Sequence, residues 1–340
     1  MDIEKAIAVE RLVEPVESTP DSMLVSELRP TRFEQYPGQE KAKENLKVYV
    51  KAALRRDNPL DHVLLHGPPG LGKTTLAHIV ANELGVPFYS TSGPSIDKPG
   101  DLAGMLAGLE EGALLFIDEI HRLSIQVEEV LYSAMEDFVI DVVVGQGTSA
   151  RSVRMPIAPF TLVGATTKMS HLSRPLISRF GIQERLEFYD DNSLIEIISR
   201  SAKILDIDLH DDGAVQIARC SRGTPRIANR LLKRVWDFAE IEGDHVIDQK
   251  IAKQALERLE IDQFGLDRTD REILKVISER YNGGPVGIDT LAVTIGEERS
   301  TIEDVFEPFL VHQGFLARGP RGRFITDKGM NHIAKYLTGF

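Results

Sequence analysis

Cysteine is nearly absent from this sequence of 340 residues, which contains only Cys220. An intrachain disulfide is therefore excluded, and a reducing compartment is expected. No apolar run approaches the ~20 residues that a membrane-spanning helix needs. The first twenty residues are acidic and interrupted by prolines, so they resemble neither a signal peptide nor a transit peptide. We therefore expect a cytoplasmic protein without a membrane segment.

Positive charge is also outnumbered by negative charge. The sequence has 40 Lys and Arg against 52 Asp and Glu, which gives a net charge of −12. This balance argues against a protein that coats DNA by bulk electrostatic attraction, but it leaves room for a local basic site. The length predicts two to three domains.

Residues 61–80 contain the most informative motif. A short apolar run, Val63–Leu65, precedes Gly-Pro-Pro-Gly-Leu-Gly-Lys-Thr at 67–74, and an amphipathic helix is expected to follow. This is a phosphate loop in its strand–loop–helix context. Glycines allow backbone N–H groups to surround phosphate oxygens, and the helix directs its positive end at the same anion. The residues expected to contact a nucleoside triphosphate are Gly70, Gly72, Lys73, Thr74 and Thr75, with Lys73 at the β- and γ-phosphates and Thr74 on Mg²⁺.

A second apolar run, 113–117, ends in Asp118 and Glu119. This is the Walker B arrangement, in which Asp118 holds Mg²⁺ and Glu119 orients or deprotonates the attacking water. An exposed Asp-Glu pair at a strand end is the alternative, and the phosphate loop argues against it.

Alternation of strands and helices predicts an open parallel α/β sheet in a large domain, 1–189, whose residues 1–20 form a disordered arm. The expected strands are 63–65, 88–91, 113–117, 160–165 and 185–188, and the expected helices include 40–54, 101–109 and 125–135. A β-hairpin is expected at 139–155, around Gly145-Gln146-Gly147.

Two smaller domains are expected after the sheet. Residues 190–260 contain only helical patterns, at 192–205, 212–220, 225–241 and 248–259, with Asp211 and Thr224 as helix N-caps. Residues 263–340 contain helices at 270–281, 288–295 and 300–313, then strands at 315–318 and 323–326. Three helices followed by a strand–turn–strand unit predict a winged helix.

Three further residues fit phosphoryl transfer. Thr167 ends the strand expected between the two motifs, so its hydroxyl can contact the γ-phosphate or the lytic water. Arg179 can neutralise charge on the transferring phosphoryl group, either in its own subunit or in a neighbour's site. Arg226 lies in the first turn of a helix, where a cation opposes the macrodipole unless an anion such as the γ-phosphate binds it. A turn cap for Thr167 and exposed arginines for the other two remain the alternatives.

Two surfaces are candidates for partners. Val142, Val143 and Val144 lead towards the hairpin tip, and an exposed apolar tip indicates a protein-docking site. Three arginines gather on the wing, Arg318, Arg321 and Arg323, and Arg299 begins the expected recognition helix. Such a set can bind DNA phosphates. A hairpin buried on both faces and a solvated basic turn are the respective alternatives.

Together these segments resemble the RuvB family, the bacterial Holliday junction branch migration motors of the AAA+ class. The resemblance rests on GPPGLGKTTLA, DEIHRL at 118–123, GATT at 164–167, SRFGI at 178–182, GTPRIANRLL at 223–232 and the wing GFLARGPRGR, and it covers the chain from about Glu27 onwards. It implies a P-loop AAA+ ATPase domain with a parallel sheet, a small all-helical lid domain and a C-terminal winged-helix head. It also implies a homohexamer that encircles and pumps duplex DNA with RuvA and RuvC.

The resemblance also implies roles for individual residues. Thr167 becomes sensor 1, Arg179 the arginine finger and Arg226 sensor 2, while the hairpin binds RuvA. Head residues expected to touch DNA are Arg299, Arg318 and Arg323. Residues expected to line the nucleotide site are Leu28, Arg29, Glu136, Asp137, Phe138 and Tyr189.

The sequence departs from the family pattern near the finger. Ile177 stands where relatives usually carry a basic residue, and Arg174 stands where a small polar residue is usual. Alternative functions are a clamp-loader or initiator ATPase, a protein remodeller and a scaffold without turnover. The winged module in place of a helical collar argues against a clamp loader, and the intact Asp118-Glu119 pair argues against a scaffold.

Overall fold

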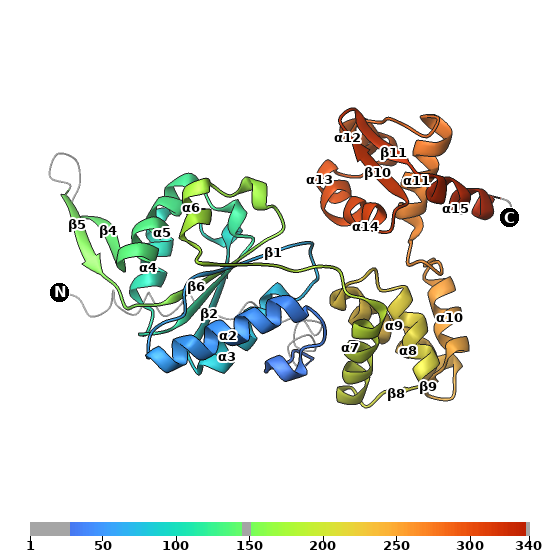
Figure 1. Cartoon of the computed structure of the whole chain (residues 1–340). Coiled ribbons are helices and arrows are strands. Elements are labelled where there is room, and N and C mark those ends of the chain that lie inside the picture. The colour runs from blue at the N-terminus through green and yellow to red at the C-terminus, as the bar shows by residue number, and fades with distance from the viewer. Residues whose placement is uncertain (1–27, 145–150, 338–340) are drawn as a thin grey trace. The chain divides into compact units, whose positions relative to one another are not determined.

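The structure, a computed structural model, describes residues 28–144 and 151–337 (Figure 1). The arm expected at 1–20 and the tip of the hairpin lie outside these residues. Contacts divide the chain into two compact units. Among the described residues, the first comprises those up to Gly67 together with those within Gly72–Leu186, and the second comprises Pro68–Leu71 together with those from Glu187 onwards. The middle of the phosphate loop therefore groups with the second unit. The boundaries at 189/190 and 260/263 stay predictions.

The first unit is built on a five-stranded parallel sheet with the order β2-β3-β6-β1-β7. Its strands are β1 (Val63–His66), β2 (Phe88–Ser92), β3 (Leu114–Asp118), β6 (Thr161–Thr166) and β7 (Ile182–Arg185). All six residues of the central strand β6 are buried, as expected for a parallel strand covered on both faces. Since β6 lies between β1 and β3, the loops that follow these three strands share one edge of the sheet.

Helices cover both faces of this sheet (Figure 1). One face carries α2 (Glu40–Arg56) and α3 (Lys73–Leu84), and the other carries α4 (Pro99–Ala107), α5 (Ile125–Asp137) and α6 (Arg174–Arg179). Buried leucines of α4 and α5 pack with β3 in one hydrophobic core. Short 3₁₀ turns occupy η2 (Phe33–Gln35), η3 (Gly93–Ser95), η4 (Ile120–Arg122) and η6 (Met169–His171).

The last strand was expected at 185–188, and that range is wrong. Strand β7 pairs with β1 over Ile182–Arg185 and ends there. The alternation of polar and apolar residues continues past Arg185, because Leu186 is fully buried. Sequence pattern alone therefore placed the strand three residues too late.

The expected hairpin is present outside the parallel sheet. Strand β4 (Val139–Val144) pairs antiparallel with β5 (Arg151–Pro156), so that Val142 lies opposite Val153. The next inward position, Ile140, is fully buried and lies opposite Met155. The base of the hairpin is thus fixed in the core of the first unit.

The second unit begins with a helical bundle. It contains α7 (Asp191–Ile204), α8 (Asp211–Arg219), α9 (Pro225–Glu242) and α10 (Gln249–Arg258). The predicted cap Thr224 precedes α9, whose first residue is Pro225, whereas His210 rather than Asp211 caps α8. The expectation of helices alone is also incorrect, because β8 (Asp208–Leu209) and β9 (Val246–Ile247) form a short parallel pair.

The remainder folds as a winged helix. Its elements are α11 (Arg268–Arg280), α12 (Ile288–Ile295), α13 (Arg299–Thr301), a π-helical turn η7 (Ile302–Phe306), α14 (Glu307–His312), β10 (Leu316–Gly319), β11 (Gly322–Ile325) and α15 (Asp327–Leu337). The single helix expected at 300–313 is therefore interrupted by the π-helical turn, and α15 was not predicted. Within the part of the chain that the structure describes, none of the helices combines the length and hydrophobicity that crossing a membrane requires.

Candidate nucleotide site and DNA-binding head

The phosphate loop joins β1 to α3 through three glycines with positive φ, Gly67, Gly70 and Gly72. Gly67 has a φ of 144°, and a Cβ there would lie 2.4 Å from the carbonyl oxygen of Leu186. Gly72 has a φ of 91° and is the N-cap of α3. Lys73 is 8% exposed, and its Nζ donates a hydrogen bond to the Gly67 carbonyl over 2.9 Å. The lysine is therefore folded back over the loop, where a phosphate oxygen can replace the carbonyl as its acceptor.

The segment before α2 packs beside the start of α3. A Cβ on Gly72 would lie 2.9 Å from the hydroxyl oxygen of Tyr36, and the Tyr36 side chain is buried. Leu28 is buried as well. Burial, followed by the charge of Arg29, lowers the pKa of His78 on α3 to about 4. Arg29 thus lies near the same helix that carries Lys73 and Thr74. The expected place of Leu28 and Arg29 at the nucleotide stays a prediction.

The two carboxylates expected to act in hydrolysis lie at the end of β3, where Asp118 is the last residue of the strand and Glu119 follows it. Asp118 Oδ1 accepts the Glu119 backbone N–H at 2.9 Å, and Glu119 is left-handed with a φ of 47°. The carbonyl of Glu119 would lie 2.5 Å from a Cβ on Gly93, so only glycine fits at that position. Glu119 Oε2 forms an ion pair with Arg122 over 3.3 Å. The expected base is held by a neighbouring cation here and must leave it to orient a water molecule.

The end of β6 is tied to the turn after β3. Thr166 Oγ1 is 3.1 Å from Nδ1 of His121 and accepts the backbone N–H of Lys168 over 2.9 Å. Burial lowers the pKa of His121, so its imidazole is neutral near pH 7. Because Thr166 uses its hydroxyl internally, the adjacent and half-buried Thr167 is the better placed of the two for a sensor role.

Arg179 makes contacts within its own chain. Its Nη2 forms an ion pair with Glu136 over 3.1 Å, its Nη1 donates to the Pro175 carbonyl over 2.8 Å, and the guanidinium lies 4.4 Å from the Tyr132 ring centroid. The side chain remains 19% exposed. Its Nε is buried and has no hydrogen-bond partner among the described residues. The structure therefore brings two predicted site residues, Arg179 and Glu136, together.

In the second unit, the turn before α9 lies against the middle of the phosphate loop. The Arg226 backbone N–H donates to the Gly70 carbonyl over 3.4 Å, and a Cβ on Gly70 would lie 3.3 Å from the Cβ of Arg226. Tyr189 donates its hydroxyl hydrogen to the Leu71 carbonyl over 3.2 Å. The exposed Arg226 side chain thus starts beside the loop expected to hold phosphates.

The cations expected to bind DNA fall into two groups. Arg318 is 64% exposed on the wing, and Arg299 is 56% exposed but paired with Asp289 and Glu303. Arg323 differs, since its side chain is only 7% exposed and forms ion pairs with Glu307 over 2.8 Å and Glu303 over 3.2 Å. The expectation that Arg323 contacts DNA phosphates does not fit this geometry. Its charge is already neutralised inside the head.

Comparisons with known proteins match most of the chain. Family models described as the Holliday junction DNA helicase RuvB P-loop domain, the RuvB AAA lid domain and the RuvB C-terminal winged helix domain match residues 28–186, 189–262 and 263–334. The Holliday junction branch migration complex subunit RuvB of Staphylococcus aureus (strain bovine RF122 / ET3-1) is 55% identical over 96% of this chain and 98% of its own.

The chain belongs to the RuvB family.

Two further relatives support the assignment. The Staphylococcus haemolyticus (strain JCSC1435) RuvB subunit is 54% identical over 96% of this chain and 99% of its own. A solved structure of the Thermotoga maritima RuvB Holliday junction branch migration motor is 50% identical with a TM-score of 0.83, over 91% of this chain and 98% of that one. The predicted fold class, a P-loop AAA+ domain with a helical lid and a winged-helix head, is therefore confirmed.

Magnesium fits the RuvB-type nucleotide site only together with a nucleotide. The donors expected at the sheet edge are one hydroxyl, Thr74, and one carboxylate, Asp118, and oxygen donors are those that Mg²⁺ prefers. Within residues 28–144 and 151–337, no group of three or more His, Cys, Asp or Glu side chains is arranged to hold a metal. The remaining ligands must therefore be phosphate oxygens and water, as is usual for Mg²⁺ in nucleotide sites.

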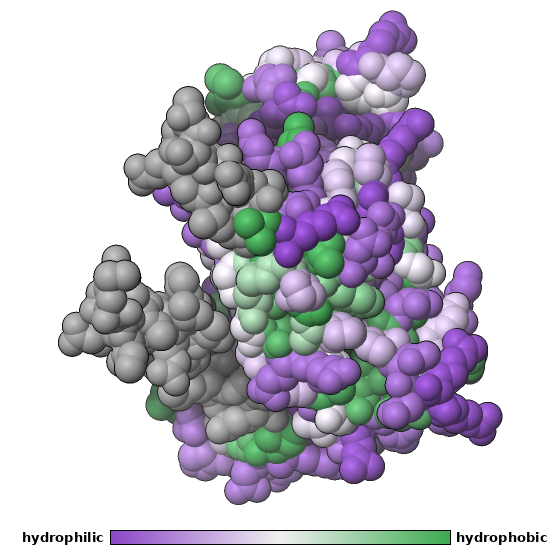
Figure 2. All heavy atoms as spheres, turned by 90° about the vertical axis from the view of Figure 1, so that its left-hand side faces the viewer, coloured by the Kyte–Doolittle hydropathy of each residue, from purple (hydrophilic) through white to green (hydrophobic). Residues whose placement is uncertain are grey.

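The hairpin supplies a partly apolar surface on the P-loop domain. On β5, Val153 is 49% exposed and Met155 is 37% exposed. The side chains of Val142, Val143 and Val144 lie outside those that the structure describes. Over the visible face, Figure 2 shows hydrophobic side chains in separate patches among hydrophilic ones. The proposed docking role of the hairpin stays a prediction.

Sequence reasoning missed several residues that hold this RuvB-family site in place. Arg122 pairs with Glu119, Tyr132 lies under Arg179, and His121 contacts Thr166. Arg122 follows Glu119 by three residues, a spacing that could have indicated the pair. The partners of Tyr132 and His121 are 45 or more residues away in sequence and come from other elements, so no local signal marks them.

The buried ion pair in the head leads to a stability prediction. We expect Arg323→Ala to destabilise the head by about 3–5 kcal/mol, because the Glu307 carboxylate is left buried without its cation. Hydrogen exchange of peptides from β10, β11 and α14, measured in the full chain, gives the free energy of opening. Arg321→Ala serves as the exposed control, because Arg318 also lies 3.9 Å from Glu307. Arg323→Met with Glu307→Leu should recover most of the loss. Weakened DNA binding without faster exchange would instead support a direct DNA contact by Arg323.

Proposed function

We propose that this RuvB-family chain is an ATP-driven DNA translocase that moves Holliday junctions. The observation that carries the proposal is the convergence of the phosphate loop, Asp118-Glu119 and Thr167 at one sheet edge of a chain that also has a RuvB winged-helix head. The first part can hydrolyse a nucleoside triphosphate, and the second can hold a polymer.

The residues of this chain suit phosphoryl transfer. Lys73 would exchange the Gly67 carbonyl for β- and γ-phosphate oxygens, and Thr74 with Asp118 would hold Mg²⁺. The bound Mg²⁺ would neutralise charge on the phosphates. Glu119, released from Arg122, would orient or deprotonate the attacking water, and Thr167 would position it. Arg179 and Arg226 would stabilise the charge that develops on the γ-phosphoryl group.

We further propose that six copies form a ring and that Arg179 completes the site of a neighbouring copy. The support lies in its partial exposure and in a buried Nε that lacks a hydrogen-bond partner within residues 28–144 and 151–337. The hairpin would dock RuvA, and RuvC would act in the same complex. This work would take place in the bacterial cytoplasm on duplex arms, with contacts to phosphates and hence little sequence preference.

The test is ATP-driven movement of a synthetic four-way junction, with and without RuvA. We expect movement to require ATP, Mg²⁺ and RuvA, and we expect binding of the junction to weaken as salt rises. Absence of movement under all these conditions, with the ATPase active, would contradict the motor and favour an ATPase that switches on DNA.

A further inference from the structure

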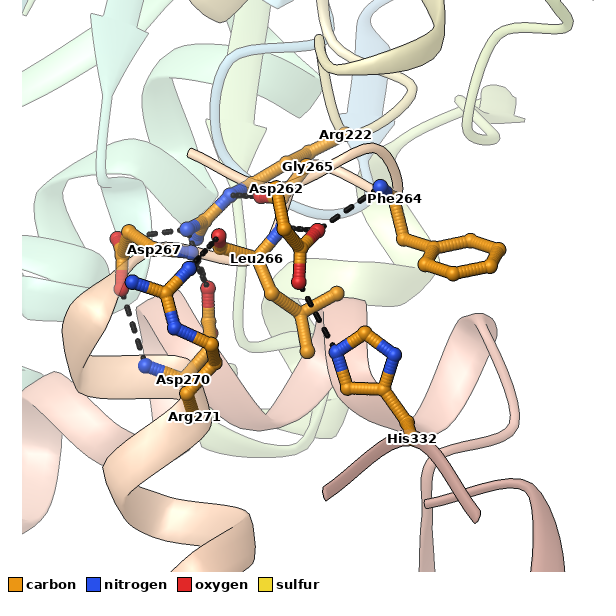
Figure 3. A network of polar contacts seen from close by, with 9 residues as sticks. All are labelled: Arg222, Asp262, Phe264, Gly265, Leu266, Asp267, Asp270, Arg271 and His332. Carbon is orange, nitrogen blue, oxygen red and sulfur yellow. Dashed lines mark hydrogen bonds and ion pairs between the residues drawn. The ribbon is translucent and has the colours of Figure 1, made fainter. Parts of the chain in front are cut away.

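Arg222, which no motif singled out, extends from the turn before α9 into the winged-helix head (Figure 3). Its Nη2 donates to Asp267 over 2.6 Å and also to Asp270, and its Nε donates to the Gly265 carbonyl over 2.9 Å. The guanidinium lies 5.1 Å from the Phe309 ring centroid, and the side chain is 10% exposed. The arginine is thus enclosed by head residues.

The two aspartates also cap the first helix of the head. Asp267 Oδ1 accepts the Asp270 N–H, and Asp270 Oδ2 accepts the Asp267 N–H, each over 3.0 Å. This reciprocal pattern is a capping box at the start of α11. Asp270 is fully buried, and its second oxygen has no partner among the described residues. Arg222 therefore fixes the end of a helix, and its loss would leave a buried carboxylate without its cation.

The same turn contacts the phosphate loop through residues only two to four positions away. Thr224 and Arg226 lie against Gly70, while the Gly223 carbonyl accepts the N–H of Tyr189, whose hydroxyl reaches Leu71. Arg222 and Gly223 both have positive φ, at 53° and 67°. A left-handed arginine is uncommon and is kept only where its surroundings fix it. The turn is thus held at both ends, by the loop and by the head.

Other contacts also join the bundle to the head. Cys220 Sγ donates to the Asp262 carbonyl over 3.3 Å, and the Asp262 carboxylate accepts the N–H groups of Phe264 and Leu266 and lies 2.9 Å from Nε2 of His332. The rings of Phe188 and His312 are 4.4 Å apart. Removing the Arg222 side chain therefore leaves the head attached, so the effect of its guanidinium can be isolated.

We propose that Arg222 is a positioning residue that links the head to the nucleotide-contacting turn, so that movements of this turn reach the DNA-binding domain. The inference rests on the proposed function, because it assigns the head as the part that moves DNA. It goes beyond that function by naming the contact through which a change at the phosphate loop is passed on.

The experiment compares full-length Arg222→Met with the wild type in three assays. We expect ATP hydrolysis without DNA and salt-dependent junction binding to be unchanged. Branch migration per ATP hydrolysed should fall about tenfold or more, since a 1.4 kcal/mol loss of coupling already corresponds to tenfold. Arg234→Met is the matched control, because Arg234 lies on α9 and is 52% exposed beside Asp237. It should retain full branch migration.

A second variant separates coupling from stability. Arg222→Met combined with Asp270→Leu removes both charges, so that no buried carboxylate is left unpaired. It should fold at least as well as the single variant and still be uncoupled. If hydrolysis and branch migration fall in parallel in both variants, or if branch migration per ATP is unchanged in either, the proposal is overturned.

A readout without DNA distinguishes this proposal from the proposed function. Addition of a non-hydrolysable ATP analogue should change hydrogen exchange at the start of α11 in the wild type and in Arg234→Met, but not in Arg222→Met. An equal change in all three proteins would overturn the link, whatever the motor assay shows. Failure of the wild type to move junctions contradicts only the motor function.

Discussion

Glu119→Gln is expected to bind ATP with near wild-type affinity and to reduce kcat by about 10²–10⁴, the range that a general base contributes. The glutamine keeps the size and hydrogen-bonding capacity of the side chain but cannot take a proton. Because the Glu119 side chain is 46% exposed and its ion pair with Arg122 lies at the surface, the fold should be unaffected. Single-turnover hydrolysis with a fluorescent-nucleotide titration separates binding from chemistry.

The control for this variant is Glu129→Gln, an exposed carboxylate on the following helix, α5. It should hydrolyse ATP at the wild-type rate. Brisk turnover by Glu119→Gln, with affinity and assembly unchanged, would remove Glu119 from the role of base and direct attention to another carboxylate at the sheet edge.

Arg179→Ala should lower ATP hydrolysis by about 10³–10⁵, the effect typical of an arginine finger, while leaving nucleotide binding intact. Arg179 also contacts Glu136 and Tyr132 in its own chain, so the variant could lose activity because the domain is destabilised. Glu136→Gln tests this, because it breaks the ion pair and keeps the arginine. We expect that variant to unfold at the wild-type temperature, since a partly exposed ion pair contributes little to stability.

Mixing the two inactive variants tests whether the arginine acts in a neighbour's site. Some interfaces in the mixture contain both catalytic groups. In these, an Arg179→Ala subunit supplies Glu119 and a Glu119→Gln subunit supplies Arg179. At equal proportions about a quarter of head-to-tail interfaces would be of this kind, so activity should return to a measurable level. If mixing restores no activity, a finger supplied in trans is contradicted. The same holds if Arg179→Ala alone shows wild-type activity that persists at high dilution.

The sequence predicted those features that depend on residues close together in the chain. The phosphate loop was expected between a strand and a helix, and Asp118-Glu119 at a strand end, and the structure has both there. Their roles in hydrolysis stay predictions. The order of the strands agrees with the expectation that Thr167 follows a strand between them. The end of β7 was misplaced because burial continues into Leu186 after backbone pairing has stopped.

Tertiary contacts explain what the sequence did not reveal. Arg323 reads as a wing cation, yet Glu303 and Glu307, from the preceding helical segment, neutralise it. Arg222 stands beside a recognisable motif, but its partners lie 45 and 48 residues later. Charge along the chain gives no information about such pairs, because only the folded head brings them together. The only local feature that marked these partners was the capping box, which places Asp267 and Asp270 at the start of α11.

The environment of Cys220 has a practical consequence for measuring motion. Burial raises the pKa of its thiol to about 12, and the side chain is only 1% exposed. The thiolate that maleimide dyes require is therefore essentially absent at neutral pH. A cysteine introduced at an exposed position of the wing can thus carry a fluorophore in an otherwise natural sequence, and single-molecule energy transfer can follow the head without first replacing Cys220.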